Sequence, residues 1–232
     1  MAALIIAAVT TKDAEPKSPF DHPDVAKLFE ELFPVLVGES DRGAVLIATA
    51  QVDEQLRLLW EAATPSDFGA KALSRVMRYP GVLSSLAARA DAARMANLIT
   101  KHIYDAIGHL RKIRNEVAHS PESFRLRDHE PEIRRVYELG PNLPIGINRL
   151  ANELVLQGLI GQAMQMKNPL DETKPAFANP GEVMDYLSGK PELVAPLEEK
   201  RPRFELAIGA TLLCASIIFA RNAAKKRLGT GE

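Results

Sequence analysis

The sequence predicts an all-α protein, a helical bundle with a helical C-terminal extension, and three stretches support this prediction. Residues 100–119 place apolar side chains at steps of three and four, which is the spacing of one buried helix face. Residues 40–60 begin with a serine that can cap a helix and are apolar on nearly all sides up to residue 50, as expected for a central helix. Residues 204–220 form a third apolar run. Helices that bury such faces against one another give a bundle.

Length and charge set the first limits on function. The chain has 232 residues, enough for one sizeable domain or for a domain with an appendage. Its 29 basic and 30 acidic residues give no overall positive field of the kind that indicates nucleic-acid binding, although a local basic patch stays open. The sequence has neither a glycine-rich nucleotide loop nor histidines at metal-ligand spacing, so we expect no cofactor and no metal site.

Two features favour a cytoplasmic protein. The single cysteine, Cys214, cannot form a disulfide within the chain and lies in an apolar run. No basic segment precedes the short apolar stretch at residues 4–9, so we expect no secretory signal. Residues 1–23 contain three prolines and mixed charges and are expected to form a mobile N-terminal lead-in.

Residues 24–139 are predicted to form the helical bundle domain that carries the motifs. Asp24 is the expected cap of its first helix, which Gly38 can end. Ser40 is the expected cap of the second helix, and Asp41 in the first turn of that helix suits its dipole. A further helix is expected within residues 80–99, capped by one of the two serines at positions 84 and 85.

One carboxylate lies in the middle of the helix that follows Ser40. Asp53 is either an exposed or neutralised carboxylate, or a buried acceptor for a basic residue on another helix, because a buried charge needs a partner. The sequence leaves both alternatives open.

The remaining chain divides into two predicted segments. Residues 140–202 should contain one helix, at 145–166, and then a proline-rich excursion that admits only short helical turns. Residues 203–232 should form a C-terminal apolar helix with a basic tail. The apolar run is shorter than the about 20 residues that span a membrane, so we expect a core helix and no membrane insertion.

A polar cluster ends the predicted helix at residues 100–119. Arg114, Asn115 and His119 form the string Arg-Asn-x-x-Ala-His, and Arg111 and Lys112 precede it. Basic residues in a last helical turn complement the partial negative charge there, so capping alone could explain the cluster.

The string resembles the arginine and histidine motif of the HEPN superfamily. Three blocks, at residues 39–56, 80–99 and 110–120, also resemble the mannitol repressor family in the same order. The first block contains Glu39, Ser40, Asp41, Arg42 and Asp53. The pair Arg203–Phe204 is similar to the start of that family's last helix.

Resemblance to the mannitol repressor family implies an all-helical regulator that acts in negative control of transcription through protein partners. The sequence has no helix-turn-helix pair with a basic recognition helix, so direct, sequence-specific DNA binding is not expected. In this interpretation Arg114, Asn115 and His119 tie helices together. The candidate acceptors are Asp53, Glu39 and Asp41.

Resemblance to the HEPN superfamily implies the alternative, a metal-independent endoribonuclease of a toxin or defence module. His119 would be the general acid or base, Arg114 would hold the phosphate and Asn115 would orient it. On one continuous helix Arg114 and His119 diverge by about 140°, so this site needs an unwound helix end or a second copy. The resemblance implies a homodimer. Exposure of Arg114 and His119 in a groove with Arg111 and Lys112 would favour RNA, whereas burial against carboxylates would favour a structural role.

Overall fold

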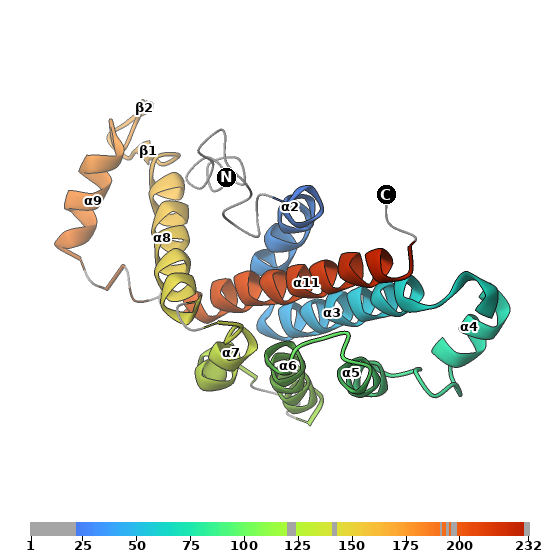
Figure 1. Ribbon diagram of the computed structural model, residues 1–232. Helices are drawn as coiled ribbons and strands as arrows, with labels where there is room; N and C mark the ends of the chain where they lie inside the picture. Colours follow the sequence, from blue (N-terminus) through green and yellow to red (C-terminus); the bar gives the residue numbers. More distant parts are fainter. Residues whose placement is uncertain are drawn as a thin grey trace.

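The computed structural model describes residues 22–119, 124–140, 143–190, 192–193, 195 and 199–229. In this part of the chain, 76% of the residues are helical and nine α-helices pack as a bundle, which confirms the all-α prediction (Figure 1). The helices are α2 (Pro23–Gly38), α3 (Asp41–Ala63), α4 (Ala70–Met77), α5 (Leu86–Met95), α6 (Lys101–His119), α7 (Glu130–Val136), α8 (Leu143–Ala163), α9 (Pro180–Ser188) and α11 (Arg201–Arg227). Two 3-10 turns, η2 (Ser66–Phe68) and η3 (Leu126–His129), and an antiparallel hairpin of β1 (Lys167–Asn168) and β2 (Asp171–Pro175) complete the described structure.

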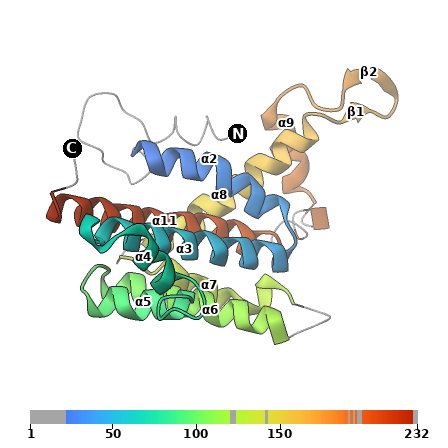
Figure 2. The same cartoon turned by 90° about the vertical axis from the view of Figure 1, so that its right-hand side faces the viewer.

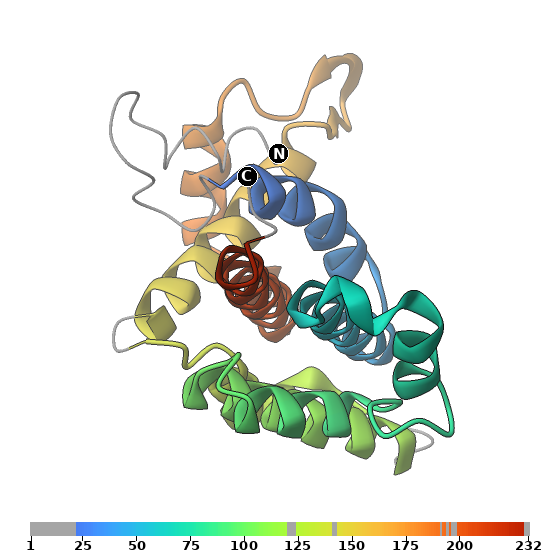
Figure 3. The same cartoon turned by 45° about the vertical axis from the view of Figure 1, so that its right-hand side comes forward.

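Helix α11 lies at the centre of the bundle. It runs alongside α3 and is covered by α2 on one side and by α6 and α7 on the other, while α8 packs across its N-terminal end (Figures 2 and 3). Every residue from Glu205 to Ala215 is buried. A helix enclosed on all sides must be apolar all round, which explains why its sequence has no polar stripe.

The same helix has the composition of a membrane span. Among the described residues, α11 is the helix long and apolar enough to cross a bilayer, and 72% of its most apolar window is buried inside the protein. Burial against five other helices gives this composition a role in the core, as the sequence predicts.

The N-terminal helices begin at polar caps, and the cap of α2 is not the residue that the sequence predicts. Helix α2 starts at Pro23, and its cap is His22, whose Nδ1 accepts from the Asp24 backbone N–H at 3.3 Å. The prediction of Asp24 as the cap is therefore wrong, because proline fits the first helical position and moves the start of the helix upstream. Ser40 caps α3 as predicted, since its Oγ accepts from the Gly43 N–H at 3.1 Å.

The helices that carry the motif agree with the sequence prediction. Ser85 caps α5 through the Ala88 N–H at 3.2 Å. Helix α6 ends at His119, and its buried face contains the predicted apolar residues. These are Ile103, Ile107, Leu110, Ile113 and Val117. The residues that follow, 120–123, and most of the lead-in predicted at 1–23 lie outside the described residues.

The proline-rich segment is more regular than predicted. It contains the β-hairpin and the nine-residue helix α9, so the expectation of short helical turns alone is wrong. The prolines delimit these elements instead of breaking them. Pro175 ends an edge strand, and Pro180 occupies the first position of α9 after an Asn179 cap.

A buried polar contact joins α7, α8 and α11. Glu205 is 3% exposed, and its carboxylate accepts from the Tyr137 hydroxyl and from the Asn148 Nδ2, both at 2.9 Å. Burial, and then the negative charge of Glu205, raise the pKa of Tyr137. Tyr137 packs directly over Gly209, where an added Cβ would lie 2.9 Å from its Cδ1. The glycine therefore sets the close approach of α7 to α11.

Candidate functional site

A carboxylate in the first turn of α3 joins three elements of the bundle. Asp41 accepts from Arg203 at 3.0 Å to Nε and 2.5 Å to Nη2, and its second oxygen accepts from the Leu126 N–H at 2.9 Å. One carboxylate thus links α3 to α11 and to the turn η3. Charge-assisted bonds of this kind are about twice as strong as neutral ones.

The neighbouring residues of this block also have local roles. Arg42 donates from Nη1 to the Val117 carbonyl of α6 at 3.3 Å. Glu39 is exposed, and within the described residues its carboxylate forms no ion pair. Within the described residues, none of the predicted acceptors Glu39, Asp41 and Asp53 accepts from a side chain of the motif, so the expected tie between helices is not formed. Arg42 contacts the motif at the backbone carbonyl of Val117.

Asp53 pairs with an arginine that the sequence analysis did not identify. Arg89, on α5, is 7% exposed and donates from Nη1 to the Asp53 carboxylate and from Nη2 to the Met77 carbonyl at 3.2 Å. The Trp60 Nε1 donates to the Arg89 carbonyl at 3.2 Å. Asp53 is therefore the acceptor for a basic residue on another helix, but it is not a buried one, because its side chain is 35% exposed.

Two arginines of α6, Arg111 and Arg114, have no carboxylate partner among the described residues. Arg114 is exposed, and its Nη1 donates only to the neighbouring Asn115 Oδ1, at 3.3 Å. Arg111 is half-buried, and among the described residues no carboxylate lies within ion-pair distance of either guanidinium. Both guanidinium groups therefore keep donors that a ligand can use.

These side chains line a cleft of about 470 Å³ between α3, the start of α5 and α6. The cap and first residues of α5, from Ser85 to Ala87, line the same cleft, and a helix start carries a partial positive charge. The polar lining consists of Thr49, Asp53, Ser85, Arg111, Arg114 and Asn115.

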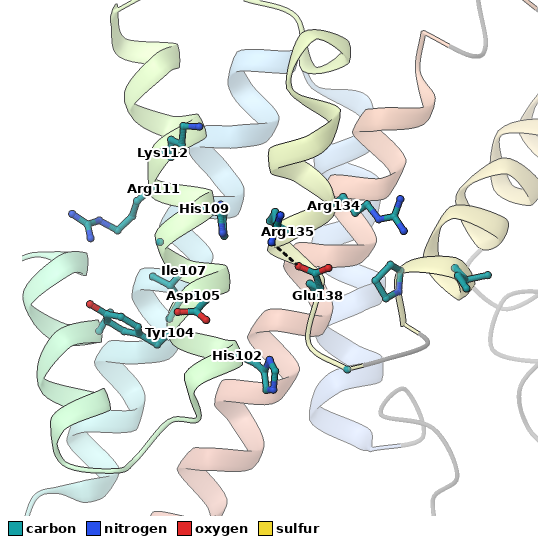
Figure 4. Close-up of a pocket in the computed structure, with 15 residues that line it drawn as sticks. His102, Tyr104, Asp105, Ile107, His109, Arg111, Lys112, Arg134, Arg135 and Glu138 are labelled. Carbon is teal, nitrogen blue, oxygen red and sulfur yellow. Dashed lines mark hydrogen bonds and ion pairs between the residues drawn. The ribbon is translucent and has the colours of Figure 1, made fainter.

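A larger cleft of about 750 Å³ lies over α6, α7 and the start of α8. Figure 4 shows His102 and His109 projecting from α6 toward α7, which contributes Arg134 and Arg135, while Arg111 extends from the other side of α6. Arg111 lines both clefts, so the two lie on either side of one shared side chain of α6.

Two cations at this surface are already neutralised. Lys112 donates to Glu132 at 2.6 Å, and this contact raises the pKa of Lys112 and lowers the pKa of Glu132. Arg135 lies 3.4 Å from Glu138. Arg134 is exposed and has no carboxylate within ion-pair distance in the described part of the chain. Lys112 therefore forms a structural ion pair with Glu132, whereas Arg134 is available to a ligand.

His119 does not join this surface. It is exposed at the last position of α6 and lines none of the described clefts. The helix is continuous through His119, so its side chain diverges from Arg114 by about 140° around the axis. The structure thus brings Arg111, Arg114 and Asn115 together and leaves His119 apart.

Sequence reasoning missed part of this surface. Arg134 and Arg135 flank the buried Ile133 in a short helix, and their polar position in that pattern already indicated exposure. Their approach to α6 depends on how α7 packs, which no local pattern encodes. Within the described residues, no group of three or more His, Cys, Asp or Glu side chains could hold a metal ion.

Comparisons of the chain with protein-family models, with curated proteins and with solved structures each returned no match. The resemblances to the mannitol repressor family and to the HEPN superfamily therefore stay predictions.

Proposed function

We propose that this chain is a regulatory interaction protein that acts in negative control of transcription through protein contacts, without reading DNA directly. The binding part of the proposal depends on one observation, the separation of Arg114 from His119 on an unbroken helix. A general acid or base must lie within hydrogen-bond reach of the reacting group that the phosphate-holding arginine positions. The transcriptional part depends on the resemblance of three sequence blocks to the mannitol repressor family.

The first and second blocks contribute to the scaffold, which supports a binding protein built on a rigid bundle. Asp41 and Arg42 join α3 to α11 and α6, and Asp53 anchors α5 through Arg89. The motif that follows them leaves Arg111 and Arg114 free for a partner. Binding residues carried on rigid helices meet a partner with little loss of conformational entropy.

A deletion of the gene tests this proposal. Transcript levels in the deletion strain should change, and wild-type protein should restore them. We expect His119→Ala to restore them equally well, because His119 lies outside the clefts, whereas the double variant Arg111→Gln/Arg114→Gln should fail. Equal failure of the His119→Ala variant would contradict the proposal. So would strong, sequence-specific DNA binding by the purified chain.

The second candidate is the metal-independent endoribonuclease. The exposure of Arg114, Asn115 and His119 favours it, since all three side chains can reach a partner molecule. Because one chain separates Arg114 from His119, a second copy would have to supply the missing group, as the HEPN resemblance implies. Cleavage that requires His119 and a homodimer would favour this candidate over the first.

A further inference from the structure

The two clefts on α6 share a cationic lining that the bundle does not use. Within the described residues, neither Arg111 nor Arg114 has a carboxylate partner. The carboxylate in the smaller cleft, Asp53, is already bound by Arg89. The larger cleft adds Arg134, also unpaired within the described chain. Three unpaired guanidinium groups thus line these two clefts. They favour an anionic ligand, because each can donate a pair of hydrogen bonds to a carboxylate or a phosphate.

The lining of the smaller cleft argues against a single-stranded nucleic acid. Proteins that bind single strands combine basic grooves with aromatic side chains on which the bases stack. The rings of Tyr104, His102 and His109 all belong to the larger cleft, and the Tyr104 hydroxyl donates to Asp91 of α5 at 2.8 Å. The lining of the smaller cleft, which contains Arg114, has no ring on which a base could stack.

Other groups in the same clefts suit a polypeptide. The carboxylates Asp53 and Glu138 in these linings are already paired, with Arg89 and with Arg135, so they do not neutralise the three unpaired guanidinium groups. Ile145 is 69% exposed beside Pro144 at the rim of the larger cleft, which gives apolar side chains of a partner a place to pack. Mixed polar and apolar contacts of this kind are typical of protein interfaces.

We propose that an acidic segment of a partner protein docks across α6, with Arg111 between the two clefts, Arg114 at one end and Arg134 at the other. This inference names the class of partner for the regulatory function above and therefore rests on it. The acidic side chains of the segment bind the guanidinium groups, and its apolar side chains pack against the exposed Ile145.

Fluorescence anisotropy with the full chain tests the proposal at low salt. The two labelled probes are an oligoglutamate peptide and an oligouridylate of the same net charge. We expect saturable, salt-sensitive binding of the oligoglutamate, and weaker binding of the oligouridylate. The double variant Arg111→Gln/Arg114→Gln should weaken oligoglutamate binding by about tenfold or more, and Arg134→Gln by about threefold to tenfold.

Arg149→Gln is the matched control. Arg149 is exposed on α8 and lines neither cleft, so its loss removes one positive charge without touching the proposed surface. Its binding should stay within about twofold of the wild type. Tighter binding of the oligouridylate, absence of saturable peptide binding, or an equal loss in Arg149→Gln would each overturn the proposed partner class. Those results leave the transcript experiment unchanged, so failure of the inference and failure of the proposed function can be told apart.

Discussion

Replacing Gly209 with alanine tests the central position of α11. In an exposed helix interior, alanine stabilises by about 1 kcal/mol relative to glycine. At Gly209 the new Cβ would lie 2.9 Å from Tyr137 Cδ1 and 3.1 Å from Tyr137 Cβ. Ordinary contacts between carbon atoms are about 3.5–4.0 Å, so either α7 or the ring must move.

The surroundings make that movement costly. The ring of Tyr137 is held at its far end by the hydrogen bond to Glu205, a bond to a buried carboxylate worth about 1.5–3 kcal/mol. Overpacking of a core costs about 1–3 kcal/mol, and partial loss of the hydrogen bond adds to it. After the helix-propensity gain is subtracted, we expect Gly209→Ala to lower the free energy of unfolding by about 1–3 kcal/mol.

Urea unfolding of the full chain, followed by circular dichroism, measures this change. Gly158→Ala is the matched control, because Gly158 lies inside α8 and a Cβ there would meet nothing within 4 Å. The control should raise the free energy of unfolding by up to about 1 kcal/mol. If Gly209→Ala were stabilising to the same degree, the close packing of α7 on α11 would be refuted.

Further predictions concern the Asp53–Arg89 ion pair, the thiol of Cys214 and the central helix α11. Asp53→Asn leaves the Arg89 guanidinium buried without a carboxylate, so it should lower the free energy of unfolding, measured in urea, by about 2–4 kcal/mol. A loss below about 0.5 kcal/mol would show that the pair contributes nothing. Burial raises the pKa of Cys214 from 9.0 to about 12, so its contribution to stability is complete below pH 9 and is lost as the pH rises toward 12. Tyr137, whose pKa is also raised, contributes to the same alkaline loss, so Cys214→Ala should reduce this slope without abolishing it. The same burial predicts negligible reaction of native Cys214 with a thiol reagent at neutral pH and complete reaction in urea, and rapid native labelling would contradict it. Backbone amides of residues 205–215 should exchange with deuterium more slowly than those of α9, and the reverse order would place α11 outside the core.

The sequence predicted helices where local signals are strong. The apolar spacing in α6 and the caps Ser40 and Ser85 each depend on residues within a few positions of one another. The β-hairpin and α4 were missed because short elements carry weak periodicity and take their stability from neighbouring contacts. The prolines near α9 were interpreted as breaks, although proline at a first helical position favours the helix.

The candidate site was predictable in composition but not in arrangement. The motif placed Arg114, Asn115 and His119 near one helix end, and helix geometry alone already separated the first from the last. The partner of Asp53 was not predictable, because Arg89 is 36 positions away and is one of two basic residues in its helix. Arg134 joins Arg111 only through the packing of α7 against α6, which is a property of the tertiary fold.

Incubation of the purified chain with mixed single-stranded RNA, in the presence of a chelator, tests the central claim most directly. The claim is that the motif on α6 binds a partner and does not cleave RNA within one chain. His109→Ala serves as the control beside His119→Ala, since His109 is also a histidine of α6. We predict that no cyclic-phosphate ends form with the wild type or with either variant. Chelator-resistant cleavage that persists in His109→Ala and disappears in His119→Ala would contradict the claim.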